Sequence, residues 1–150
     1  MSVRTLALPA RRLALAAALL GLGSLACAVG SQTARETDFY EIQKHYTQMI
    51  RWSQFDRARN FVETDGLGSF SDQTRSFRDV RFTDYAIHGV EFSEDGGAAK
   101  VLVTYFAYLR TAPVAVAYEE QQEWRRPDGR LWRVRSNFEQ RPVEPGEGVF

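Results

Sequence analysis

The sequence contains one cysteine, Cys27, among its 150 residues. A single cysteine cannot form a disulfide within the chain, so the folded domain has to be held together by its core. Histidine is scarce as well. His45 and His88 are the only two, and neither belongs to a His-x-x-x-His motif or a cysteine cluster. We therefore predict no metal site, and we expect no cofactor.

Sequence motifs of catalysis are missing too. There is no glycine-rich phosphate loop, no nucleophile elbow and no acid-pair motif. We accordingly assign no catalytic residue. Whether the protein is an enzyme stays open, with a non-enzymatic role favoured.

The longest apolar run, LALAAALLGLGSLA at positions 13–26, is short. A helix over this run would rise about 21 Å, less than the roughly 30 Å of a bilayer's hydrocarbon core. The run follows a basic segment with Arg4, Arg11 and Arg12, and small residues come after it. This pattern predicts that residues 1–26 are a cleavable export signal. An uncleaved anchor helix is the alternative.

The charge balance argues against a general nucleic-acid binder. The whole chain has 19 basic and 19 acidic residues, and residues 1–26 contain three arginines and no acid. The exported part is then left with 16 basic and 19 acidic residues, a net charge of −3. Nucleic-acid binding needs a basic surface that neutralises phosphates, so we expect no nucleic-acid partner. Local basic patches remain compatible with this balance.

Cys27 ends the apolar run, and Ser24-Leu25-Ala26-Cys27 resembles the lipobox of bacterial lipoproteins. The resemblance implies that Cys27 becomes the first mature residue and carries acyl chains such as palmitate, which hold the protein to a membrane of the cell envelope. Each buried CH₂ of such chains contributes about 0.8 kcal/mol. In a Gram-negative organism Ala28 would favour the outer membrane. Ordinary cleavage after Ala26 or Ala28, giving a soluble periplasmic or secreted protein, is the alternative.

The sequence of the exported part indicates one domain flanked by two flexible segments. Residues 27–36 are small and polar and are interpreted as a tether, and residues 139–150 hold two prolines and two glycines and are interpreted as a flexible tail. Between them, at 37–138, the apolar residues recur first at helical steps and then at every second position. Helices followed by strands indicate the α+β class, with the helices packed on one face of the sheet.

Two helices are predicted at the start of this domain. Apolar residues at three- and four-residue steps indicate a helix from about Asp38 to Trp52. Ser53 is then expected to cap a shorter helix over residues 55–63. Residues 64–74, rich in Gly, Ser and Asp, predict a loop with room for one helical turn.

Four strands follow, separated by turns at 93–97, 111–113 and 127–129, and the chain there predicts an antiparallel meander. Their expected ranges are about Val80–Phe92, Ala98–Arg110, Val114–Arg126 and Leu131–Phe138. This order over about residues 38–138 resembles the NTF2-like superfamily, which includes SnoaL and ketosteroid-isomerase-like proteins. The resemblance implies a strongly curved, cone-like sheet around a helix, a pocket between them and frequent homodimers.

The third strand supplies the candidate pocket wall. Alternation places Tyr118, Glu120, Gln122 and Trp124 on one face. An apolar floor with a few polar groups suits a small ligand. His88, in register with Phe92, and Trp52, at the junction of the two helices, are two further possible pocket residues. The alternative is that the glutamates of this strand pair with Arg133 and Arg135 on the next strand. His45 is interpreted as a surface histidine.

Three functional hypotheses remain open. The favoured one is a module that binds a small apolar ligand or an envelope protein. The second is an enzyme of the isomerase or dehydratase type, because isomerases of the resembled superfamily use a carboxylate with a tyrosine; Glu120 with Tyr40 or Tyr105 would take those roles. The third is an assembly module that forms a homodimer through its sheet.

Overall fold

The computed structural model describes the backbone of residues 23–143 and the side chains of 36–112 and 114–143. Most of the predicted signal peptide, the side chain of Cys27 and the end of the predicted tail lie outside these ranges. The chain divides into two units between Thr37 and Asp38, and the second unit carries the sheet. Within the described residues, no helix combines the length and apolar character needed to cross a membrane.

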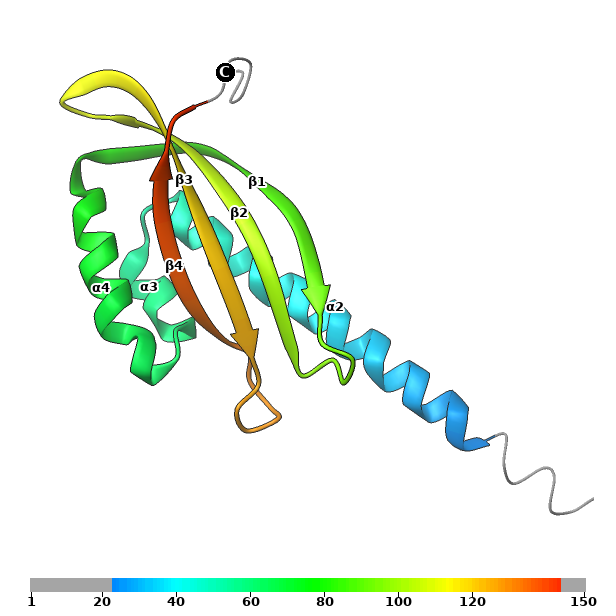
Figure 1. Ribbon diagram of the computed structural model, residues 1–150. Coiled ribbons are helices and arrows are strands. Elements are labelled where there is room, and N and C mark those ends of the chain that lie inside the picture. Colours follow the sequence, from blue (N-terminus) through cyan, green and yellow to red (C-terminus); the bar gives the residue numbers. More distant parts are fainter. Residues whose placement is uncertain (1–22, 144–150) are drawn as a thin grey trace, which may run out of the picture. The chain divides into compact units, whose positions relative to one another are not determined.

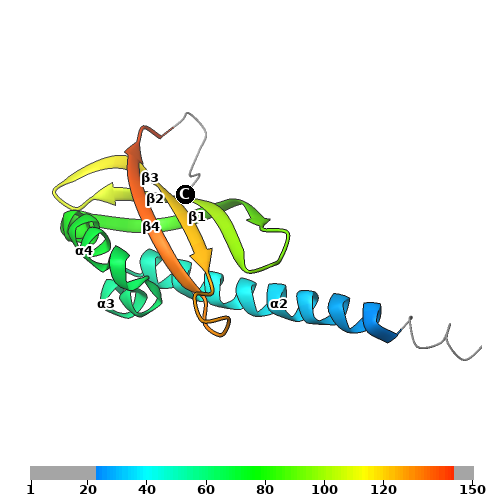
Figure 2. The same cartoon turned by 60° about the horizontal axis from the view of Figure 1, so that its bottom comes forward.

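Helices come first and strands second, so the α+β class is confirmed. The four strands form one antiparallel sheet in the order β1-β2-β3-β4, which curves around the helices that precede it (Figures 1 and 2). The strands lie close to their predicted ranges. The elements are α2 (Gly23–Arg51), α3 (Phe55–Ala58), η1 (Arg59–Phe61), η2 (Thr64–Gly66), α4 (Leu67–Arg75), η3 (Ser76–Asp79), β1 (Val80–Phe92), β2 (Ala98–Leu109), β3 (Ala112–Arg125) and β4 (Arg133–Arg141).

Helix α2 begins further upstream than predicted and ends where expected. Its backbone is helical through residues 27–36, the segment interpreted as a tether. That segment contains no proline, so nothing interrupts the helix there. At the other end, Ser53 adopts a left-handed φ of 56°. The Ser53 and Gln54 amides donate to the carbonyls of Ile50 and Met49. Ser53 therefore terminates α2. The prediction that it caps the next helix is wrong, because the N-cap of α3 is Gln54.

The predicted loop at 64–74 is largely helical, because η2 runs into the nine residues of α4. Gly, Ser, Asp and Thr are weak helix formers, so local preference does not account for this helix. Phe70, only 2% exposed, anchors it in the core. The hydroxyls of Ser71 and Thr74 donate back to the carbonyls of Leu67 and Phe70. Burial of one aromatic ring overrides local propensity here.

Strand β1 contains a bulge at His88. Its pairing with β2 shifts by one residue between Ile87 and Gly89, which makes His88 the extra residue. The bulge reverses the alternation that would have put His88 on the same face as Phe92. Phe92 packs against the core, whereas the exposed His88 ring lies 2.7 Å from the Thr104 hydroxyl on the convex face.

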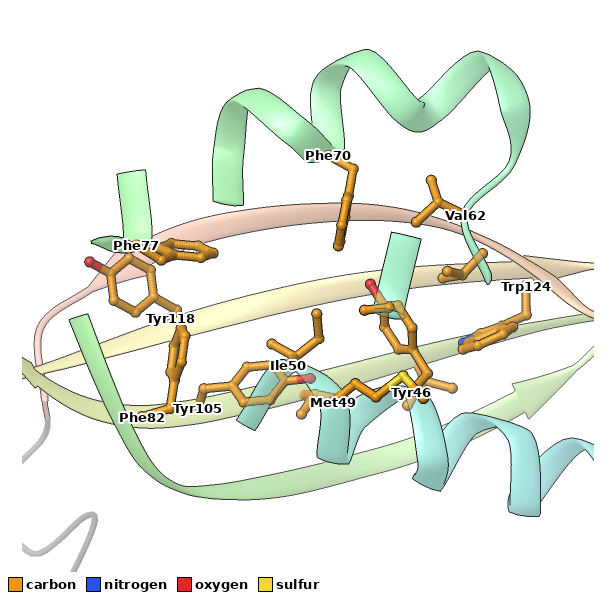
Figure 3. Close-up of a cluster of buried hydrophobic side chains, with 14 of the residues drawn as sticks. Tyr46, Met49, Ile50, Val62, Phe70, Phe77, Phe82, Tyr105, Tyr118 and Trp124 are labelled. Atoms are coloured by element: carbon orange, nitrogen blue, oxygen red, sulfur yellow. The ribbon is translucent and has the colours of Figure 1, made fainter. Parts of the chain in front are cut away.

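The core fills the space between the concave face of the sheet and the helices. Met49 and Ile50 of α2, Phe70 of α4 and Trp124 of β3 project into one interior (Figure 3). Most of the aromatic pairs meet edge to face, and the centroids of Phe77 and Tyr118 are 4.9 Å apart. Such pairs stabilise a core beyond the area they bury.

Candidate functional site

Glu120 is the one acidic side chain in the interior of the described part of the chain, and it is 0% exposed. Tyr46 of α2 donates a hydrogen bond to its Oε1 atom at 2.7 Å, and Tyr105 of β2 donates to Oε2 at 2.8 Å. Gln122 donates to Oε2 at 2.6 Å, and the Ser136 hydroxyl of β4 donates to Oε1. Each carboxylate oxygen therefore accepts two hydrogen bonds. Such saturation is what allows a buried polar group to be tolerated.

Further polar side chains hold Gln122, one of the donors to Glu120, in place. The Gln122 Oε1 atom accepts bonds from Trp124 at 3.0 Å and from Gln43 at 3.2 Å. Gln43 also donates to the Thr47 hydroxyl at 2.9 Å. Gln43 and Thr47 are on α2, whereas Gln122 and Trp124 are on β3, so the network joins the helix to the sheet. A fully satisfied buried network of this kind fixes how the two elements pack.

The electrostatics of the cluster follow from burial. Desolvation raises the pKa of Glu120, and the four hydrogen bonds to the carboxylate oppose that rise. Burial, followed by the charge of Glu120, raises the pKa values of Tyr46 and Tyr105 well above their usual range. Both tyrosines therefore stay protonated and act as donors throughout the physiological pH range.

The structure separates the predicted pocket residues into two groups. Tyr118, Glu120, Gln122 and Trp124 share the concave face of β3, as the alternation indicates, and all four are buried. Trp52, by contrast, is 56% exposed at the end of α2, where the Arg51 guanidinium stacks 4.5 Å from its ring centroid. His88 faces outward, as described above, and it lines a depression of about 410 Å³ together with Gln122.

The tyrosines considered as partners of Glu120, and His45, differ in where the structure places them. Of the two tyrosines proposed as partners of Glu120, Tyr105 contacts it and Tyr40 does not, being 49% exposed. Tyr46 stands in the place considered for Tyr40. His45 is exposed, with its ring 6.0 Å from that of Phe61, in keeping with a surface histidine.

The expected pairing of β3 glutamates with Arg133 and Arg135 is not what the structure shows. Arg135 forms ion pairs with Glu63, at 3.0 Å, and with Asp65. Arg133 donates to the Asn60 carbonyl. These contacts arise because the segment around Val62 pairs with the free edge of β4, a long-range approach that strand alternation cannot predict.

An open pocket lies elsewhere, between α3, α4, η3 and the adjoining ends of β1 and β2. Its volume is about 890 Å³, which is within the range of small-molecule sites. Glu120 lines neither this pocket nor the pocket of about 800 Å³ beside residues 60–65. The residues lining the open pocket are Ser53, Phe55, Asp56, Arg59, Phe70, Ser71, Thr74, Arg75, Phe77, Arg78, Val80, Arg81, Tyr108 and Arg110.

Sequence reasoning missed this pocket and two partners of Glu120. Tyr46 lies on the predicted apolar face of its helix, and only the fold reveals that its hydroxyl meets an acid on β3. The position of Ser136 could have been predicted, since it shares the buried face of β4 with Val134 and Phe138. The pocket draws its lining from segments spread between residues 53 and 110, so no local pattern marks it.

No family model, curated protein or solved structure matches this chain. In the stretch that the structure describes, no three His, Cys, Asp or Glu side chains gather as metal ligands would. Function is therefore inferred from the geometry of the two sites.

Proposed function

We propose that this chain is an exported, lipid-anchored protein of the cell envelope whose NTF2-like domain binds a small ligand without transforming it. The observation that supports the binding role is the contrast between its two sites. Glu120 is enclosed and accepts four hydrogen bonds, whereas the pocket beside α3 and α4 is open. A general base has to reach a substrate proton, and an enclosed carboxylate has no such reach.

The NTF2-like assignment is supported by the order of the elements. Helices precede a meander of long antiparallel strands, and the resulting sheet curves around residues 38–51 of α2. The interior that holds ligands in the resembled superfamily is filled here by aromatic rings and the Glu120 network. A binding role therefore moves to the open pocket beside α3 and α4.

The cell-envelope location rests on the apolar run at 13–26 and on Cys27 at its end. Mass spectrometry of the mature N-terminus tests it. The expected first residue is Cys27 with acyl chains attached. An intact Met1 on protein recovered from the cytoplasm, or cleavage after Ala28, would contradict the lipoprotein assignment.

A thermal-shift screen of small metabolites tests the binding role. Thr74 lines the pocket and is half-buried, so Thr74→Trp should fill part of the space. Ser69→Trp, at an exposed position on the same helix outside the pocket, is the matched control. Compounds that stabilise the wild type and the control but not Thr74→Trp are the expected result. A screen in which every hit also stabilises Thr74→Trp would contradict it.

A second candidate is an enzyme of the isomerase or dehydratase type. Its supporting observation is Glu120 with a raised pKa beside two tyrosine donors. This reading requires that the interior opens to admit substrate. Turnover of a screened compound, abolished by Glu120→Gln in a protein that still folds, would establish it in place of the binding role.

A further inference from the structure

We propose that the pocket between α3, α4 and the sheet binds a small organic anion that carries phosphate groups. This inference rests on the proposed binding function and names the ligand class of that same pocket. Five arginines line the pocket, against a single carboxylate, that of Asp56. The arginines are Arg59, Arg75, Arg78, Arg81 and Arg110.

Four of these arginines have no acidic partner within the described residues. Arg75 is paired with Asp72 at 3.2 Å. The other ion pairs of the described chain involve Arg125, Arg135 and Arg141, none of which lines the pocket. The four guanidiniums without such a partner are exposed, so they are available to a ligand. With Asp56 the local charge is about +3, although the exported chain as a whole carries −3.

Concentrating like charges is unfavourable unless an anion neutralises them. The unpaired guanidiniums come from three places: Arg59 follows α3, Arg78 and Arg81 flank the start of β1, and Arg110 follows β2. Arginine presents a planar set of donors that matches phosphate oxygens two at a time. A charge of about +3 suits a diphosphate or a ligand with two phosphate groups better than a single carboxylate.

The floor of the pocket indicates that the ligand is organic. Phe70, Phe77 and Val80 line it and are each at most 5% exposed, so their rings and methyl groups belong to the rigid core. Half-buried Phe55 and the exposed ring of Tyr108 add apolar surface at the sides. An apolar floor under a charged rim accommodates a molecule with an apolar body and anionic groups.

Two acids near the pocket, Asp56 and Asp79, would oppose the binding of an anion. Asp56 lines the pocket, and its charge sets a limit on the affinity for an anion. Asp79 lies between Arg78 and Val80 but lines a neighbouring depression of about 390 Å³. Neither acid forms an ion pair with the four arginines, so the pocket keeps a net positive charge.

Isothermal titration of the full chain with sodium pyrophosphate, in detergent at about 20 mM and about 150 mM salt, tests the proposal. Saturable one-site binding that weakens at the higher salt is expected. The double variant Arg78→Gln/Arg81→Gln should bind at least about tenfold more weakly. Arg57→Gln is the control, because Arg57 lies on α3 outside the pocket and bonds Gln54; its affinity should stay within about twofold.

Two further ligands distinguish the source of the phosphate group. Glycerol 3-phosphate and dihexanoyl phosphatidic acid share one headgroup, and only the second carries acyl chains. Tighter binding of the lipid would assign the pocket to a membrane headgroup. Equal binding of the two would assign it to a water-soluble phosphate. Either result supports the proposal that the pocket binds a phosphate-bearing anion.

Absence of pyrophosphate binding, or equal binding by wild type and the double variant, would overturn the anion proposal. Neutral compounds that still lose binding in Thr74→Trp would then leave the general binding function standing. If pyrophosphate binding does not depend on Arg78 and Arg81, and binding of neutral compounds does not depend on Thr74, the binding function is overturned as well.

Discussion

Tyr46 on α2 donates a 2.7 Å hydrogen bond to Glu120 on β3, across 74 positions of sequence. This contact joins the helix to the centre of the sheet through a charge that would be costly to bury alone. It makes the acid a part of the fold.

Stability should depend on pH through Glu120. Its folded pKa is raised by burial, so the folded state holds the proton more tightly than the unfolded state does. The contribution of Glu120 to the free energy of unfolding is therefore greatest at acid pH, and it falls as pH rises from the unfolded pKa, roughly 4.3, through the folded pKa. Urea unfolding of wild type and Glu120→Gln at a series of pH values measures this. The difference in unfolding free energy, wild type minus variant, should fall across that window. A constant difference would contradict the raised pKa.

Removing either tyrosine donor should destabilise the protein. Tyr46→Phe and Tyr105→Phe each leave one Glu120 oxygen with fewer bonds, and we expect a loss of about 1–3 kcal/mol for each. Tyr108→Phe, at a ring that is 41% exposed, is the control and should change stability by less than about 0.5 kcal/mol. Calorimetry or chemical unfolding gives the values. Losses no larger than the control's would mean that the network does not support the fold.

Helix α4 should depend on Phe70. Phe70→Ala removes the one buried ring of a helix with weak local propensity, and a loss of about 3–5 kcal/mol is expected. Amide hydrogen exchange should show that residues 67–75 open first in this variant. Ser69→Ala, at an exposed position of the same helix, should leave exchange unchanged. Equal protection of α4 in both variants would contradict the anchoring role of Phe70.

The turn between β3 and β4 should need a glycine. Gly129 has a φ of 70°, in the left-handed region, so Gly129→Ala should cost about 1–2 kcal/mol. Gly89 lies in β1 without a left-handed φ, and an added Cβ there would meet no atom within 4 Å. Gly89→Ala is thus the matched control and should be neutral or slightly stabilising. Equal melting temperatures for the two variants would refute this account of the turn.

The sheet was predictable from the sequence because its signals are local. Period-two alternation and the turns at Gly96 and Gly129, both with positive φ, define the strands and place Glu120 on the buried face of β3. The partners of Glu120 were not predictable in the same way, since Tyr46 lies on a helix distant in sequence. Gly89 was the one available hint of the bulge that turns His88 outward.

Helix α4 and the arginine-lined pocket were missed for a related reason. The composition of residues 64–74 favours a loop, and only the burial of Phe70 in the finished core makes that segment helical. The unpaired arginines come from three segments between residues 59 and 110, and the near-zero charge of the whole chain conceals them. Charge totals therefore did not reveal where positive charge is concentrated.

The enclosure of Glu120 is most directly tested by labelling carboxyl groups of the folded protein with a carbodiimide and an amine, read by peptide mass spectrometry. Glu119 and Glu123 flank it with side chains 35% and 43% exposed, and they serve as internal references. We predict that both neighbours are labelled while Glu120 stays unmodified until the protein is unfolded. Labelling of Glu120 in the folded protein at the rate of its neighbours would contradict the structural role and favour an accessible, catalytic acid.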